Sequence, residues 1–151
     1  MRGWSQLVVP LLAFIAAGPL NSLAEPPSDP QVEAYLDKAD AYFEAGNFEA
    51  AVREYDGAIS IAGPTERLLS LRGGAKFRLG DYRGADADVT RAIQLNPGDA
   101  YLFLLRALSR SLFKPPDREG TCSDFEQARM LGLDIREVAD GIEEWCVNAE
   151  Q

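Results

Sequence analysis

Residues 46–59 read GNFEAAVREYDGAI, and 34 positions later residues 80–93 read GDYRGADADVTRAI. A glycine, a polar residue, an aromatic residue, alanines at fixed spacing and an isoleucine recur with one period. A period of about 20 to 50 residues is typical of stacked supersecondary units. The repeat therefore decides the fold class before any other feature of the chain is considered.

Each unit holds two helical patterns separated by a tight turn. Tyr35, Ala39 and Tyr42 fall on one face of a first helix, and after Gly46 a second apolar stripe runs through residues 48–62 at three- and four-residue steps. The unit is therefore predicted to be helix, turn, helix.

The helix boundaries carry their own signals. Asp29 and Thr65 are predicted N-caps, and Asn96 before a proline predicts the end of the fourth helix. Gly46 and Gly80 occupy the inner turns, where a positive φ disfavours any residue with a Cβ.

These residues resemble the tetratricopeptide repeat (TPR) family, whose unit has 34 residues with large, small and aromatic side chains at fixed places. The first copy spans residues 32–65, the second 66–99 and a variant third 100–133. The residues that carry the resemblance in the first two copies are Tyr35, Ala39, Tyr42, Gly46, Phe48, Ala51, Tyr55, Ala58, Leu69, Gly73, Gly80, Tyr82, Ala85, Val89, Ala92 and Pro97. The resemblance implies an all-α, right-handed α-α superhelix of about three helix pairs.

The third copy departs from the pattern. It begins on schedule with Phe103 and Ala107, but Lys114-Pro115-Pro116 lengthens its inner turn, so that later positions recur after 36 residues. Thr121 replaces the small alanine of its second helix. Its helix pair is still expected to stack on the second copy.

A last helix is predicted over residues 134–148, with Asp134 as its cap and Glu137 closing a capping box. A helical array needs a terminal element over its last hydrophobic face, and we expect this helix to serve as that cap.

Two cysteines, Cys122 and Cys146, are 24 residues apart. This spacing is wrong for a redox CxxC, and a chain without histidine offers too few ligands for tetrahedral zinc. A structural disulfide that holds the cap is therefore favoured.

The N-terminus differs from the rest of the chain. Arg2 precedes the apolar run LVVPLLAFIAA (residues 7–17), and Ser22-Leu23-Ala24 resembles a cleavage site. We interpret residues 1–24 as a cleaved secretory signal and 25–31 as a short leader; a membrane anchor is the alternative, but the run is shorter than the ~20 residues of a spanning helix. The mature protein is then expected to be exported, in a periplasm or outside the cell, without membrane insertion.

Charge is unevenly distributed along the chain. Signal cleavage would leave 14 basic and 24 acidic residues, a net charge of −10, which argues against nucleic-acid binding. Residues 25–65 and 117–151 are acidic, with nine and ten acids against two and three bases, whereas residues 66–116 carry nine bases and five acids.

A base recurs in the first helix of each copy and an acid in the second. The predicted pairs are Lys38 with Glu54, Arg72 with Asp88, and Arg106 with Asp124. A basic ladder for an anionic ligand is the alternative, but the matching acids favour salt bridges that hold the two helices in register.

In TPR proteins the first helices of the units line a concave groove, and the resemblance transfers those places to this chain. The groove residues so implied are Glu33, Asp40, Phe43, Arg67, Phe77, Arg78, Tyr101 and Leu104. One subclass binds a free C-terminal carboxylate with lysine, asparagine and arginine; here the corresponding places hold Leu36 and Asp40, and an aspartate would repel a carboxylate. This specificity is therefore not expected.

The sequence predicts a protein-binding module rather than an enzyme. It has no histidine to act as a base near pH 7, no nucleophile motif and no cofactor fingerprint, and no cofactor is expected. The leading hypothesis is an adaptor that binds a segment of another protein in its groove. The alternative is a structural subunit that self-associates or docks through its convex or terminal faces; the oligomeric state is not predicted.

Overall fold

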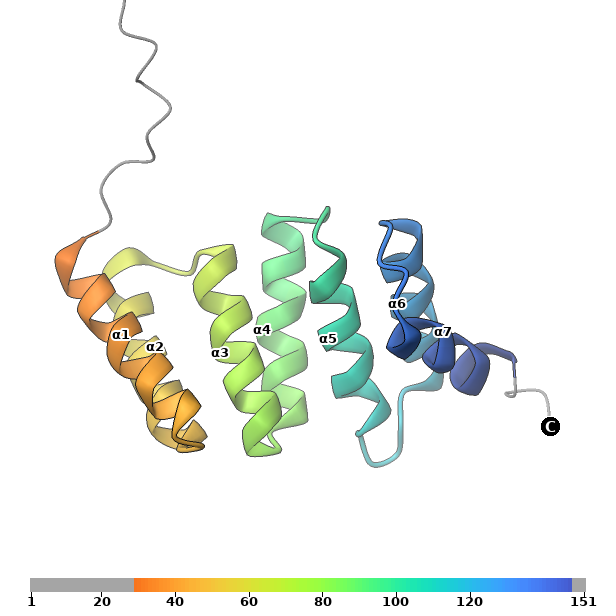
Figure 1. Cartoon of the computed structure of the whole chain (residues 1–151), viewed down its shortest axis with the longest axis horizontal. Helices are drawn as coiled ribbons and strands as arrows, with labels where there is room; N and C mark the ends of the chain where they lie inside the picture. The colour runs from red at the N-terminus through yellow and green to blue at the C-terminus, as the bar shows by residue number, and fades with distance from the viewer. Residues whose placement is uncertain (1–28, 148–151) are drawn as a thin grey trace, which may run out of the picture.

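The computed structural model describes residues 29–147, and this part of the protein is entirely helical (Figure 1). Residues 1–28, which include the predicted signal peptide, and residues 148–151 lie outside the described residues. The seven α-helices and one π-helical turn of the described part are α1 (Pro30–Glu44), α2 (Phe48–Ala62), α3 (Glu66–Leu79), α4 (Tyr82–Leu95), α5 (Ala100–Ser111), α6 (Arg118–Met130), α7 (Arg136–Ile142) and η1 (Glu143–Val147).

The helices form two layers. α1, α3 and α5 stand side by side in one layer, and α2, α4 and α6 lie behind them in the other (Figure 1). We call the first helix of each pair helix A and the second helix B. The all-α helical-repeat fold predicted from the 34-residue period is thereby confirmed.

The polar caps predicted from the sequence begin the helices. The Asp29 carboxylate accepts from the Gln31 amide at 2.8 Å, and the Thr65 hydroxyl accepts from the Leu68 amide at 3.2 Å. Gly46 and Gly80 have φ values of 76° and 89°, which confirms the two glycine turns.

Alanines bring the helices of each pair into close contact. Eight of them are fully buried within the A and B helices: Ala39, Ala51, Ala58, Ala75, Ala85, Ala92, Ala107 and Ala128. Larger side chains fill the remaining space, and Tyr55, Leu69, Val89 and Phe125 are each at most 2% exposed. The buried side chains form two core clusters, one over α1–α3 and one over α3–α7, and half-buried Ile59 packs against both.

The last helix begins later than predicted. Ile135, in an extended conformation, precedes the first residue of α7 and offers no side-chain cap, so the prediction that Asp134 caps this helix is wrong. The reason is local: the first helical amides, those of Val138 and Ala139, donate to the Ile135 carbonyl, so Ile135 is the N-cap and Asp134 lies one position before it.

Candidate binding groove

A hollow of about 280 Å³ opens between α1 and α3. Helix α2 contributes one residue to it, and the two A helices contribute the rest: its lining is Asp40, Phe43, Glu44, Tyr55, Ser70, Leu71 and Gly74. We call it the first hollow. It contains two of the predicted groove residues, Asp40 and Phe43.

A buried tyrosine anchors one side of the first hollow. Tyr55 is 2% exposed, and its hydroxyl donates to the exposed carboxylate of Asp40 at 2.7 Å. Burial raises the pKa of Tyr55, the bond to Asp40 raises it further, and the charge of Arg67 acts in the opposite direction. The phenol therefore stays neutral and continues to donate at physiological pH.

A second hollow, of about 400 Å³, lies between α5 and the α7–η1 segment. Its lining is Leu108, Ser111, Leu112, Phe125, Glu137, Asp140, Gly141, Glu144 and Trp145. After allowance for the two-residue insertion in the third inner turn, every residue of the first hollow has a counterpart here, from Asp40 at Leu108 to Gly74 at Glu144. The two hollows are thus the same structural position, two units apart.

This equivalence assigns α7 a place in the array. Arg136 begins α7 as Ala100 begins α5, 36 residues earlier, and α7 with η1 has the position of a fourth helix A. The sequence treated this segment only as a cap. In the structure it also forms a wall of the groove, which the sequence reasoning missed because the insertion before Asp117 obscures the period.

Two of the three predicted interhelical pairs are present as bidentate contacts. Arg72 donates from Nε and Nη2 to both carboxylate oxygens of Asp88, at 2.7 and 2.5 Å. Arg106 makes the same two bonds to Asp124, at 2.9 and 2.6 Å. Both aspartates are buried, so the charges depend on each other for stabilisation.

The acid–base balance of the second unit follows from this contact. Burial alone would raise the pKa of Asp88, but the hydrogen bonds from Arg72 and Lys76 outweigh it and hold that pKa below its ordinary value. The bond to Asp88 in turn raises the pKa of Arg72. The pair is ionised at neutral pH.

Each arginine also reaches the preceding unit, which the sequence reasoning did not predict. Arg72 Nη1 donates to Asp56 on α2 at 2.6 Å, and Arg106 Nη1 donates to Thr90 on α4 at 3.3 Å. Asp56 and Thr90 are 34 positions apart, so the period itself held the signal. Each guanidinium therefore joins three helices.

A second cation supports each buried aspartate. Lys76 lies 2.9 Å from Asp88, and Arg110 lies 3.1 Å from Asp124 and 2.6 Å from Asp86. Lys76 and Arg110 are also 34 positions apart, and Lys76 stands where the repeat usually has an aromatic residue. The departure from the family pattern was the signal for this contact.

The first unit lacks its predicted pair. Among the described residues, no ion pair joins Lys38 to Glu54; the Lys38 ammonium lies 5.7 Å from the centroid of the Tyr35 ring. A lysine cannot make the bidentate, planar contact that positions the arginines. The hydrogen bond from Tyr55 to Asp40 links α1 to α2 instead.

The remaining predicted groove residues differ in exposure. Tyr101 is 64% exposed at the start of α5, whereas Leu104 is half-buried against the core. Phe77 packs edge-to-face on Tyr82, with ring centroids 5.6 Å apart. The face of Phe77 toward Tyr82 is therefore covered by α4.

The other charged groove residues lie toward the N-terminal end. The guanidinium of Arg78 lies over the Phe48 ring at 4.8 Å and the Phe43 ring at 5.9 Å, which places it at the edge of the first hollow. Arg67 is exposed and Glu33 half-buried, whereas Leu36 belongs to the core and does not line the groove.

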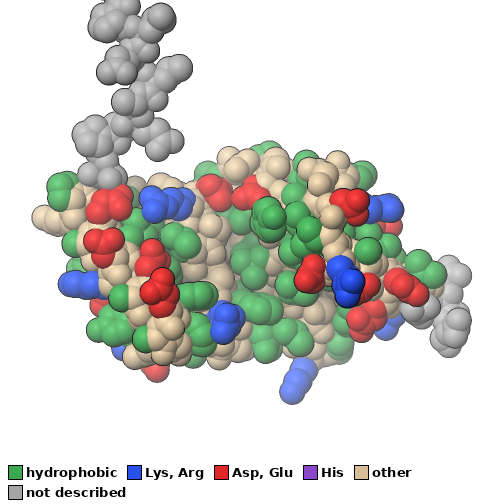
Figure 2. Space-filling model, in the orientation of Figure 1, with side chains coloured by type: hydrophobic (Ala, Val, Ile, Leu, Met, Phe, Trp, Pro, Cys, Tyr) green, Lys and Arg blue, Asp and Glu red, His purple; other side chains and the backbone are tan. Residues whose placement is uncertain are grey.

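The space-filling view shows the charge pattern on the A-helix face. Acidic side chains gather at the α1 end and again around α7, with hydrophobic side chains across the middle (Figure 2). The far end is acidic because α7 and η1 bring Glu137, Asp140 and Glu144 to it.

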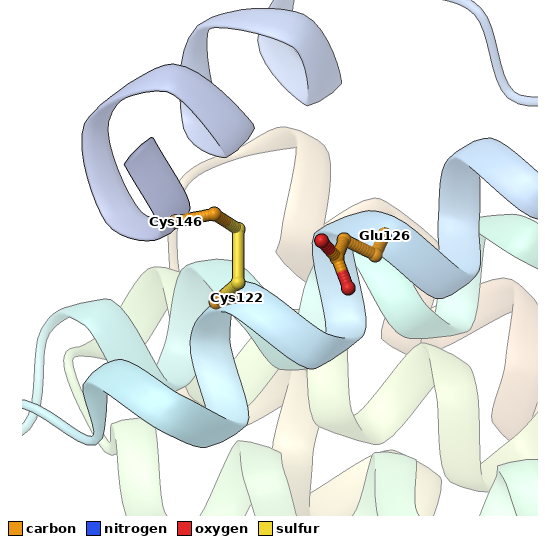
Figure 3. Close-up of side chains that lie close together, drawn as sticks. All are labelled: Cys122, Glu126 and Cys146. Atoms are coloured by element: carbon orange, nitrogen blue, oxygen red, sulfur yellow. A yellow bond between two sulfur atoms is a disulfide. The ribbon is translucent and has the colours of Figure 1, made fainter. Parts of the chain in front are cut away.

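A disulfide joins Cys122 on α6 to Cys146 on η1, with the Cα atoms 5.1 Å apart (Figure 3). A carboxylate oxygen of Glu126 lies within 4.8 Å of both sulfur atoms. The disulfide leaves no thiolate to bind a metal, so this cluster serves to hold η1 against α6.

Known proteins share this repeat. A tetratricopeptide repeat family model matches residues 32–64. This part of the chain therefore matches a tetratricopeptide repeat. The chain is 30% identical over 99 residues to RNA polymerase II-associated protein 3 of Xenopus tropicalis, and 34% identical over 73 residues to the human mitochondrial import receptor subunit TOM70. These alignments cover 66% and 44% of the chain but only 14% and 12% of the relatives.

Solved TPR domains have the same fold. The first TPR of Spaghetti (RPAP3) bound to an HSP90 peptide gives a TM-score of 0.73 at 20% identity, over 80% of this chain and 94% of that one. The second TPR domain of human RPAP3, in complex with an HSP70 peptide, gives 0.68 at 23% identity, over 76% and 93%. In the described part of the present chain, no helix is both long and apolar enough to span a membrane.

Proposed function

We propose that this TPR protein is a non-enzymatic adaptor that binds an extended segment of another protein along its A-helix face. The observation that carries the proposal is the pair of equivalent hollows, which lie on one face and are bounded by four successive A positions. Hollows of this kind accept the side chains of a bound chain, and the groove between them fixes its direction.

The comparisons support the mode of binding and leave the ligand open. The two similar TPR domains hold peptides that end in Glu-Glu-Val-Asp. In this chain Leu36 is buried and Asp40 bears a negative charge in the first hollow, so a terminal carboxylate there would meet repulsion. The proposed partner is therefore not an acidic C-terminus.

We place this function in an exported protein. The basis is the predicted signal over residues 1–24 together with the Cys122–Cys146 disulfide, since disulfides persist in oxidising compartments. The intact mass of the protein from the native host checks this. A mass beginning at Glu25 with no thiol open to alkylation is expected, and a full-length chain with two free thiols would contradict it.

Photo-crosslinking in the native host tests the groove. A benzoylphenylalanine at Ser70, inside the first hollow, should capture a partner protein, whereas the same residue at Arg91, exposed on the B-helix face, should not. Capture from Arg91 alone would contradict the proposal and favour docking through the convex face. A product made of two copies of this chain would favour self-association.

A further inference from the structure

The second hollow combines an apolar floor with an acidic rim. Leu108, Leu112, Phe125 and Trp145 supply the apolar surface, and three exposed carboxylates, Glu137, Asp140 and Glu144, border it. The three acids are spaced by three and four residues along α7 and η1, so they lie on one face of that segment. This face is turned to α5 across the hollow.

The three carboxylates have no counter-charge of their own. None of them forms an ion pair within residues 29–147. The nearby base Arg118 lies over the Trp145 ring, 5.4 Å from its centroid. Arg110 is engaged with Asp86, Asp117 and Asp124. The hollow is therefore a place of concentrated negative charge beside apolar walls.

The first hollow differs from the second in the charges that surround it. It has two carboxylates, Asp40 and Glu44, but Arg78 lies over Phe43 at its edge and the charge of Arg67 acts on Tyr55. The two arginines offset part of the negative charge of Asp40 and Glu44. A cationic side chain is thus favoured at the second hollow and not at the first.

We propose that the second hollow takes a lysine or arginine side chain of the bound segment. The aliphatic stem of such a side chain packs on Leu108 and Leu112, while its cation meets the carboxylates of α7 and η1. This inference rests on the proposed function, because it assigns the chemistry of one end of the same groove.

Binding to labelled peptides tests the inference on the whole, oxidised chain. The probe is a fluorescein-labelled peptide pool with a fixed central Arg-Leu-Lys and randomised flanks, and the reference pool has citrulline-Leu-acetyllysine at its centre. Fluorescence anisotropy should show at least a tenfold lower Kd for the basic pool. Equal affinity for the two pools, or no binding of either, would overturn the inference.

Two triple variants with the same net charge show where on the protein the basic peptides bind. Glu137→Gln, Asp140→Asn and Glu144→Gln combined should weaken the basic pool at least tenfold. A control that carries Glu119→Gln, Glu126→Gln and Glu143→Gln loses the same three charges outside the hollow and should stay within twofold of the parent protein. Equal weakening in both would show a general attraction to an acidic protein and refute the site.

A charge reversal guards against a loss caused by misfolding. Asp140→Lys with Glu144→Lys should transfer the preference to a pool with a central Glu-Leu-Glu, a gain that an unfolded protein cannot show. Crosslinking from Ser70 separates the two proposals. If Ser70 captures the partner but the variants bind the basic pool like the parent, only this inference fails; if Ser70 also captures nothing, the groove function fails with it.

Discussion

The inner units and the ends of the array are held together by different chemistry. In α3–α4 and α5–α6, an arginine of helix A makes a bidentate contact with a buried aspartate of helix B. The α1–α2 pair has a hydrogen bond from the Tyr55 hydroxyl to the exposed Asp40 carboxylate, and a disulfide joins η1 to α6. Among the described residues, each buried aspartate thus lies in a unit that has a neighbour on both sides. Its donors come from helix A of its own unit, and the preceding unit supplies the acceptor for the third bond of each arginine.

Removal of a buried charge should have the largest effect. Asp88→Asn removes the carboxylate, 6% exposed, that pairs with both Arg72 and Lys76, and Arg72 then keeps only Asp56; we expect a loss of about 3–5 kcal/mol in the free energy of unfolding. Urea denaturation at neutral pH measures it. The same change at exposed Asp37 should cost less than about 0.5 kcal/mol; similar losses at both sites would contradict the comparison.

Acid sharpens this prediction. The pKa of Asp88 lies below its ordinary value of 3.8, so the folded state binds its proton less readily than the unfolded state. Its contribution is fully present above about pH 4 and is lost as the pH falls through the lowered pKa. The stability difference between the parent protein and Asp88→Asn should therefore shrink below pH 4. A difference that stayed constant would mean that packing, and not charge, causes the loss.

The disulfide at the other end should rank second. Cys122→Ala with Cys146→Ala opens a loop of 24 residues and is expected to cost about 2–4 kcal/mol. Amide hydrogen exchange should show lost protection in α7 and η1, whereas the protection of α1–α4 should be nearly unchanged. Reduction of the parent protein should reproduce the pattern, and loss of protection throughout the chain would indicate that the cap is not a separate end.

The hydrogen bond from Tyr55 to the exposed Asp40 carboxylate in the first unit should matter less. Tyr55→Phe keeps the ring and removes only the hydroxyl that donates to Asp40, so we expect a loss of about 1 kcal/mol. Asp40→Asn retains an acceptor and serves as the control, with a smaller loss. If Tyr55→Phe lowered the free energy of unfolding as much as Asp88→Asn, the distinction between the end unit and the inner units would be contradicted.

The smallest expected effect is a gain. The Thr121 hydroxyl is buried and has no hydrogen-bond partner within the described residues, at a position where the first two units have Ala51 and Ala85. Thr121→Ala should stabilise the third unit by up to about 1 kcal/mol, because an unpaired polar group is removed. Thermal unfolding checks it, and a clear loss of stability would show that the methyl group is needed for packing.

The sequence was sufficient for the fold because every unit repeats its own signals. Glycine turns, caps and small residues recur with a period of 34 residues. The structure confirms the turns at Gly46 and Gly80 and the burial of the alanines. It was insufficient for the last helix, since Asp134 has the chemistry of a cap but the first helical amides donate to the carbonyl of the next residue, Ile135.

The site was only partly predictable from the sequence. Position in the repeat identified Asp40 and Phe43, but it could not show that Leu36 turns into the core or that α7 continues the groove. The pairing rule failed for Lys38 because the period specifies where charges lie and not whether the two side chains can meet. Contacts between units, such as Arg72 with Asp56, depend on helix packing that no single unit specifies.

The three-helix contacts of Arg72 and Arg106 also bear on which end of the array unfolds first. Each guanidinium couples its own unit to the one before it, so that the loss of one unit weakens the contacts of its neighbour. At the far end the cap is covalently closed onto α6. Fraying under oxidising conditions therefore begins at α1 and α2, and the hollow between α5 and α7 keeps its shape after the first hollow has been lost.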